Sequence, residues 1–144
     1  MLILSRNGCA VCVSVMNKFD NFFNQEDFNR TLIKKYPWLA IREDDDSVTW
    51  LDIMPPGWRK AFGLQMVKDI QKALDREPKQ LRDSFQITDV KEKFGSLRVY
   101  SVPYIEGVEE MIDKYENMSQ HFCCYCGKCL DKPTFMPLCD ACRC

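Results

Sequence analysis

Four cysteines near the C-terminal end of the chain have a spacing that is typical of a metal site. Cys123 and Cys126 form one Cys-x-x-Cys pair, and Cys139 and Cys142 form a second pair twelve residues later. A two-residue gap lets two thiolates on one tight turn face the same ion, and two such turns supply four tetrahedral ligands. The spacing therefore predicts a closed structural zinc site, which stabilises a fold but offers no open coordination position for chemistry.

The residues that follow the two pairs differ. Gly127 follows the first pair, where positive φ lets backbone N–H groups face the thiolates, and glycine adopts that conformation at little steric cost. Arg143 stands at the equivalent place after the second pair. Reduced bystander cysteines or disulfides are the alternatives, and paired spacings favour zinc over both.

The remaining cysteines leave a second site open. Cys9 and Cys12 form another Cys-x-x-Cys pair, which is a candidate for a second metal or for a larger joint site. Small cysteines beside valines are also common as buried packing, so both interpretations stand. Cys124, Cys129 and Cys144 are further candidates for a second ion.

Catalytic residue types are scarce. His121 is the sole histidine, and histidine alone has an unperturbed pKa near neutrality. A catalytic zinc would need three protein ligands and a water, but the position of His121 beside the zinc turn favours a supporting or surface role. Thiol redox chemistry through Cys126 and Cys129 would share Cys126 with the better zinc pair. We therefore expect a protein that is not an enzyme.

Length and composition indicate one core with a small metal-stabilised tail. The 144 residues are 46% hydrophobic and 28% charged, which suits a globular chain. We predict a core domain at 1–120 and a zinc ribbon at 121–144. The 20 basic and 21 acidic residues give a formal charge of −1, and zinc-bound thiolates add negative charge, so nonspecific binding to nucleic acid is not favoured.

Cysteine usage points to the cytoplasm. Nine cysteines with clustered spacing suit metal binding in a reducing compartment better than a secreted disulfide scaffold. The apolar run at 8–16 lacks the small-residue cleavage site of an export signal. No run reaches the roughly 18 apolar residues that span a membrane, so no membrane association is expected.

The first part of the chain is predicted to contain a short hairpin and one helix. Residues 1–16 combine apolar residues, a turn signal and a β-branched run of period two. Apolar residues then recur at helical spacing from Val15, and Pro37 ends the helix. The pieces expected before the next breaker are an apolar patch at 38–41, a solvated acidic loop at 43–46 and a strand-like piece at 48–53.

Two further helices flank a predicted hairpin in the second part. The second helix begins at Trp58, ends at Pro78 and carries an apolar stripe that is typical of a core face: Phe62, Met66, Ile70 and Leu74. A strand from Phe85 then turns at Phe94 and Gly95 and returns as 96–100. A third amphipathic helix follows Pro103. The fold class is therefore α+β, with about three amphipathic helices packed on a small antiparallel hairpin, plus the zinc ribbon.

The hairpin turn carries the most concentrated positive charge. Lys91, Lys93 and Arg98 surround it, with Phe94 at the tip, and these four residues are the candidate partner-binding set. The alternative is that the cations pair with the acidic helix at 106–116, and we favour that structural interpretation. In that case Arg98 would fork onto Glu109 or Asp113.

The chain resembles a group of small, functionally uncharacterised proteins of bacteria, prophages and phages. The motifs that carry the resemblance lie within about 31–142: Lys-Tyr-Pro-Trp-Leu at 35–39, Gly57-Trp58 at a helix start, Val-Lys-Glu-Lys-Phe-Gly-Ser-Leu-Arg-Val-Tyr at 90–100 and the closing cysteine pairs. The resemblance implies a mobile-element origin but no reaction, because fold analogy alone supplies none.

Two functions follow for such a protein. The first is a zinc-stabilised binding protein that covers a host protein, such as a bacterial defence nuclease, in the manner of an anti-CRISPR inhibitor. Its acidic stretches at 43–46 and 106–116 would then imitate phosphate charge. The alternative is a nucleic-acid-binding zinc ribbon that uses the Lys91, Lys93 and Arg98 hairpin, with Phe94 and Tyr100 stacking on bases.

Overall fold

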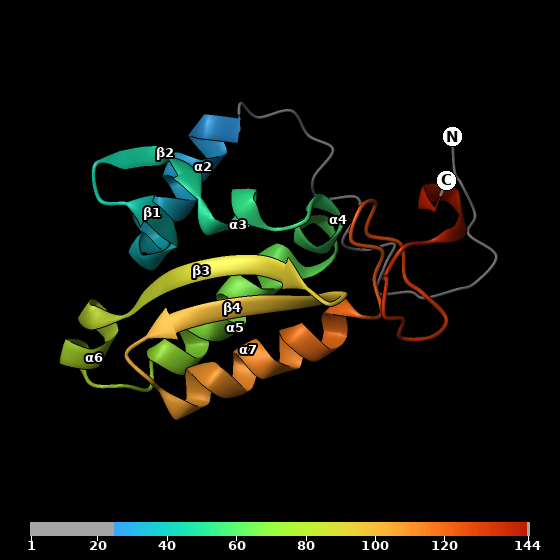
Figure 1. The fold of residues 1–144 in the computed structure, drawn as a ribbon. Coiled ribbons are helices and arrows are strands. Elements are labelled where there is room, and N and C mark those ends of the chain that lie inside the picture. The colour runs from blue at the N-terminus through green and yellow to red at the C-terminus, as the bar shows by residue number, and fades with distance from the viewer. Residues whose placement is uncertain (1–24, 144) are drawn as a thin grey trace.

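The computed structural model describes residues 25–143, and these residues form an α+β fold. The hairpin of β3 (Gln86–Lys93) and β4 (Ser96–Val102) runs across α5 (Leu64–Leu74) and α7 (Glu106–Ser119) (Figure 1). The smaller β1–β2 hairpin and α2 (Gln25–Lys35) lie on the other side of β3. The predicted fold class is confirmed. Predictions for residues 1–24, including the first hairpin and the Cys9 and Cys12 pair, lie outside the described residues.

The first described helix ends where the sequence predicted. After α2, Pro37 starts the 3-10 turn η1 (Pro37–Leu39), which leads into β1 (Ala40–Arg42). The antiparallel strand β2 (Asp45–Thr49) returns beside β1. Together these segments cover one side of the main hairpin with buried aromatic and aliphatic side chains, among them Trp38 and Leu39.

The predictions for the acidic run and the piece after it are wrong in part. Only Glu43 and Asp44 form the turn, while the rest of the run belongs to β2. The chain then coils into α3 (Trp50–Ile53) instead of continuing as a strand. Thr49 and Asp52 explain the change, because they form a capping box in which the Thr49 N–H donates to Asp52 (2.7 Å).

The second helix has the predicted core face. It begins with α4 (Pro56–Trp58), continues through the π-helical turn η2 (Arg59–Gly63) and becomes α5. All four residues of the predicted stripe are buried, as is Trp58. The helix ends at Leu74, before the predicted end at Pro78. Pro78 instead precedes a short helix that was not predicted, α6 (Lys79–Ser84), and proline is well tolerated at the start of a helix.

A buried polar network fixes the π-helical turn. Asp52 accepts hydrogen bonds from Asn29 (2.8 Å) and from Arg59 (2.9 Å), which joins α2, α3 and η2. Asn29 is almost fully buried, and its side-chain amide also donates to the Ser47 carbonyl (2.7 Å) and accepts from Gln25 (3.0 Å). Loss of Asp52 would therefore leave a buried amide with one hydrogen bond fewer. The network thereby holds the start of the second helix, which carries Gly57 and Trp58.

The main hairpin has a two-residue turn. Lys93 pairs with Ser96 across it, and Phe94 and Gly95 between them both have positive φ (53° and 78°). This conformation is that of a type I′ turn, whose twist matches the twist of the flanking strands. The turn predicted at Phe94 and Gly95 is therefore confirmed.

Helix α7 closes the free edge of β4 and also packs against α5. The Leu97 N–H donates to the Ser119 hydroxyl (2.9 Å), and the Val99 N–H donates to the Glu116 carboxylate (3.0 Å). These side chains occupy backbone donors that another strand would otherwise use. On the α5 side, the Tyr115 hydroxyl donates to Asp69. Among residues 25–143, no helix is both long and apolar enough to cross a bilayer.

Candidate metal centre

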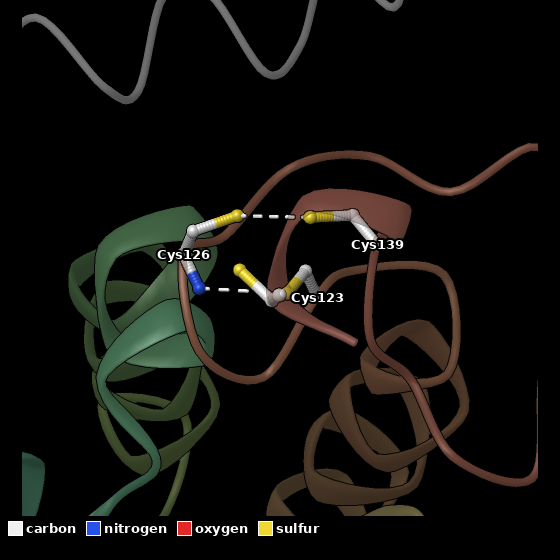
Figure 2. A group of neighbouring side chains, drawn as sticks. Cys123, Cys126 and Cys139 are labelled. Atoms are coloured by element: carbon white, nitrogen blue, oxygen red, sulfur yellow. Dashed lines mark hydrogen bonds between the residues drawn. The ribbon is translucent and has the colours of Figure 1, made fainter. Parts of the chain in front are cut away.

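The four predicted ligands converge in space. The sulfur atoms of Cys123, Cys126, Cys139 and Cys142 all lie within 4.8 Å of one another, and those of Cys126 and Cys139 are 3.6 Å apart (Figure 2). Tetrahedral zinc with Zn–S bonds of about 2.3 Å places its sulfurs roughly 3.8 Å apart. The donor set and its spacing therefore fit a four-thiolate metal site.

The first pair lies on a tight turn closed by backbone hydrogen bonds. The Cys123 N–H donates to the Lys128 carbonyl (2.7 Å), and the Gly127 N–H donates to the Cys123 carbonyl (2.8 Å). The Cys126 N–H points at the Cys123 sulfur (3.5 Å). Gly127 has φ of 82°, so its predicted positive φ is confirmed. The second pair flanks and enters the short 3-10 turn η3 (Asp140–Cys142).

Three of the four converging thiols have shifted pKa values. Burial raises the pKa of Cys123, but hydrogen bonds from the N–H of Cys126 and from neighbouring backbone groups outweigh it and lower the pKa to about 6. Burial raises the pKa of Cys126, and hydrogen bonding to Cys139 raises that of Cys142. The Cys123 sulfur is therefore the readiest to bind a cation, while Cys126 and Cys142 must release protons to do so.

Neighbouring cysteines stand apart from this group. Cys124 and Cys129 are partly buried against the core, and their sulfurs are not among the four that converge. Burial, and then the charge of Cys123, raises the pKa of Cys124. Cys144 and the Cys9 and Cys12 pair lie outside the described residues.

The turn that carries Cys123 and Cys126 packs on the start of the second helix. The Gly57 N–H donates to the Cys124 carbonyl (2.8 Å), and the Trp58 indole N–H donates to the Phe122 carbonyl (3.0 Å). A Cβ atom on Gly57 would lie 2.1 Å from the Cys123 carbonyl oxygen. The Gly-Trp motif is thus the place where the turn meets the core. The boundary predicted at residue 120 remains a prediction.

The hairpin tip rests against the second half of the ribbon. A Cβ atom on Gly95 would lie 1.7 Å from the Phe135 carbonyl oxygen, so the two backbones are in direct contact. The Gly95 N–H donates to the Glu92 carboxylate (2.6 Å), which holds the turn. Sequence reasoning missed both glycine contacts, because they join segments that are distant in the chain.

Two of the four candidate partner-binding residues are engaged within the fold. Lys91 pairs with Asp89 (3.1 Å) and stacks over the Tyr100 ring. Arg98 pairs with Glu116 (3.0 Å), which replaces the expected Glu109 or Asp113. Glu116 lies opposite β4 and also binds the Val99 N–H, whereas Glu109 accepts a hydrogen bond from Ser101.

The other two candidates face solvent. Phe94 is 68% exposed, and Lys93 lies over its ring at 5.7 Å from the centroid. Among residues 25–143, no ion pair involves Lys93. The structure therefore divides the predicted set into two cations that pair with carboxylates, exposed Lys91 and half-buried Arg98, and two exposed tip residues, Lys93 and Phe94.

Comparison with known protein families, with curated proteins and with solved structures finds no match to this chain.

Proposed function

We propose that this chain is a small zinc-stabilised, non-enzymatic binding protein of phage or mobile-element origin that covers a host protein in the bacterial cytoplasm. The observation that carries the proposal is the hairpin tip. Lys93 and Phe94 project from a turn held by Glu92 and by the ribbon, which makes them preorganised contact residues. Four thiolates complete a tetrahedral zinc shell, which suits a structural role for the ion.

Within this function, the partner class that we favour is a bacterial defence nuclease. Exposed carboxylates on α7 support this choice, because they offer negative charge to a surface built for phosphates: Glu106, Glu110 and Asp113. The acidic run at 43–46 contributes less, because Asp44 pairs with Arg42 and Asp46 pairs with Arg30.

Nucleic-acid binding through the hairpin is the weaker alternative. It relied on Lys91, Lys93 and Arg98 as free cations, but Lys91 and Arg98 are already paired with carboxylates. Such pairs reduce the charge that is available to phosphates.

Affinity capture from a lysate of the bacterial host tests the proposal. The tagged protein is used with and without nuclease treatment, and the variants Lys93→Glu and Lys72→Glu are used in parallel. Lys72 serves as the control, because it is an exposed cation in the last turn of α5. We expect a captured protein that survives nuclease, is lost with Lys93→Glu and is kept with Lys72→Glu. Capture of nucleic acid alone, or full capture by Lys93→Glu, would contradict the proposal.

A further inference from the structure

Exposed apolar side chains gather where the hairpin tip meets the ribbon. Phe94, Phe135 and Met136 are 68%, 73% and 63% exposed. The contact between Gly95 and the Phe135 carbonyl brings their two segments together, as Figure 1 shows at the turn between β3 and β4. We call these three residues the tip–ribbon patch. Single exposed apolar side chains are common on protein surfaces, but several on adjoining segments are typical of an interaction site.

Both segments of the patch are held in place by hydrogen bonds. On the tip, Glu92 accepts from the Gly95 N–H. On the ribbon, the Met136 carbonyl accepts from the Thr134 hydroxyl (2.6 Å) and from the Leu138 N–H (2.8 Å). Side chains presented from fixed backbones lose less entropy on binding, so the patch suits the role of an anchor surface.

Two lysines lie close in the sequence to the patch residues. Lys93 precedes Phe94, and Lys132 lies three residues before Phe135. Neither lysine forms an ion pair within residues 25–143. Glu92, the carboxylate beside Lys93, is directed to the Gly95 N–H. A complementary partner would therefore place carboxylates beside its own apolar contact.

The local charge favours a protein over a nucleic acid. Residues 121–144 contain three basic and two acidic side chains, and a zinc ion with four thiolates adds two negative charges. The ribbon as a whole therefore has no positive excess for an extended phosphate backbone. Positive charge is offered only locally, by Lys93 and Lys132 in the segments that carry the apolar side chains. Aromatic residues and methionine, in contrast, are enriched at protein interfaces.

We propose that the tip–ribbon patch is a protein-docking surface for a segment whose apolar anchor residues are flanked by Asp or Glu. This inference rests on the proposed function and specifies where and by what chemistry the host protein is bound. Three side chains form less than a standard protein interface, so they bind a short segment or the centre of a larger contact.

Selection from a display library of random dodecapeptides tests this surface without a known partner. The target is the zinc-loaded chain, and the selected peptides are then measured against Phe94→Asp, Phe135→Asp and the control Tyr104→Asp. Aspartate tolerates the positive φ of position 94. Tyr104 is 76% exposed and follows β4 at the end of the hairpin opposite the tip. Zinc content and melting temperature verify that each variant is folded.

We expect peptides with an aromatic or aliphatic anchor beside acidic residues. Their affinity should fall at least about tenfold with either patch variant and stay unchanged with Tyr104→Asp. No enrichment, peptides without acidic residues, or equal loss with Tyr104→Asp would overturn the inference. A labelled strand of 20 thymidine nucleotides is measured beside the peptides. If the chain bound this strand more tightly than it binds the peptides, and Phe94→Asp abolished that binding, the inference would also be overturned. A captured host protein that tolerates Phe135→Asp would overturn this surface and leave the proposed function standing.

Discussion

At the residue scale, the metal site depends on which cysteines face inward and on the glycine that supports them. The sulfur atoms of the two Cys-x-x-Cys pairs at 123–126 and 139–142 converge, while Cys124, which immediately follows Cys123, packs against the core. Adjacent residues on a turn point in different directions, so only one register of the pairs can enclose an ion. Because Gly57 has no Cβ, the Cys123 carbonyl can pack directly against the backbone of α4.

The first prediction concerns the ligands. The purified chain should hold one zinc per molecule, Cys123→Ser should lose it, and Cys124→Ser should keep it, because only the former removes a converging sulfur. Metal analysis under reducing conditions measures this. Less than about half an equivalent in the wild type would contradict a closed structural site. Loss with Cys129→Ser but not with Cys123→Ser would move the first pair to Cys126 and Cys129.

The second prediction concerns Gly57. Gly57→Ala should destabilise the fold by about 3 kcal/mol, because its Cβ would lie 2.1 Å from a backbone oxygen that cannot yield without moving the metal turn. Gly107→Ala in α7 is the control, since its Cβ would meet its nearest neighbour, the Ala73 Cβ of α5, at 3.8 Å, an ordinary van der Waals distance. It should be neutral or stabilising by up to about 1 kcal/mol. Urea melts compare the two, and equal losses would refute the close contact.

At the element scale, α7 has two roles at β4. Its side chains cap the backbone donors of the strand edge, and its Glu116 holds Arg98. Glu116 is mostly buried and accepts from both the guanidinium and the Val99 N–H. Arg98 is thus a structural residue of the hairpin, because its guanidinium is held by a mostly buried carboxylate, whereas Lys93 has no ion-pair partner within residues 25–143.

The third prediction follows from this arrangement. Arg98→Ala should lower the free energy of unfolding by about 1 kcal/mol, and Glu116→Ala by about 1–3 kcal/mol, since the latter also leaves the Val99 N–H without its acceptor. Lys93→Ala is the control and should change stability by less than about 0.5 kcal/mol. Denaturant melts measure all three. A loss with Lys93→Ala as large as with Arg98→Ala would show that the tip, too, is structural.

At the scale of the whole molecule, the ribbon is continuous with the core. It contacts α4 through Gly57 and Trp58, and the main hairpin through Gly95, while the Phe62 and Phe122 rings pack 5.8 Å apart. A metal bound by the four cysteines therefore holds segments that also position the hydrophobic core.

The fourth prediction is that zinc removal unfolds more than the tail. A chelator should lower the melting temperature of the core, because structural metal binding is folding free energy. Far-ultraviolet circular dichroism and tryptophan fluorescence, to which the buried Trp58 contributes, measure the transition. An unchanged core transition after complete metal removal would contradict this.

Acid should have the same effect by proton competition. The raised pKa values of Cys126 and Cys142 mean that binding at neutral pH releases protons, so affinity should fall as pH is lowered. The fall should be steepest near and below pH 6, where the free Cys123 thiol also becomes protonated. Zinc release monitored with a colorimetric chelator across this range checks the sign. Constant affinity would exclude thiolate ligands.

The sequence by itself determined the features that depend on short-range spacing. The two cysteine pairs, the apolar stripe from Phe62 to Leu74, and the turn at Phe94 and Gly95 each follow from residues within a few positions of one another. The capping pair of Thr49 and Asp52 was equally local and was missed. Local geometry fixes such features before any tertiary contact forms.

The tertiary structure alone decided which distant segments meet. Arg98 pairs with Glu116 and not with Glu109 or Asp113. Gly57 contacts the turn that carries Cys123, and Gly95 at the hairpin tip contacts the Phe135 backbone. Each choice depends on how the helices and the hairpin pack together, and a linear pattern does not contain those distances. The tip–ribbon patch belongs to this second group, because its members become neighbours only when the ribbon folds back onto the turn.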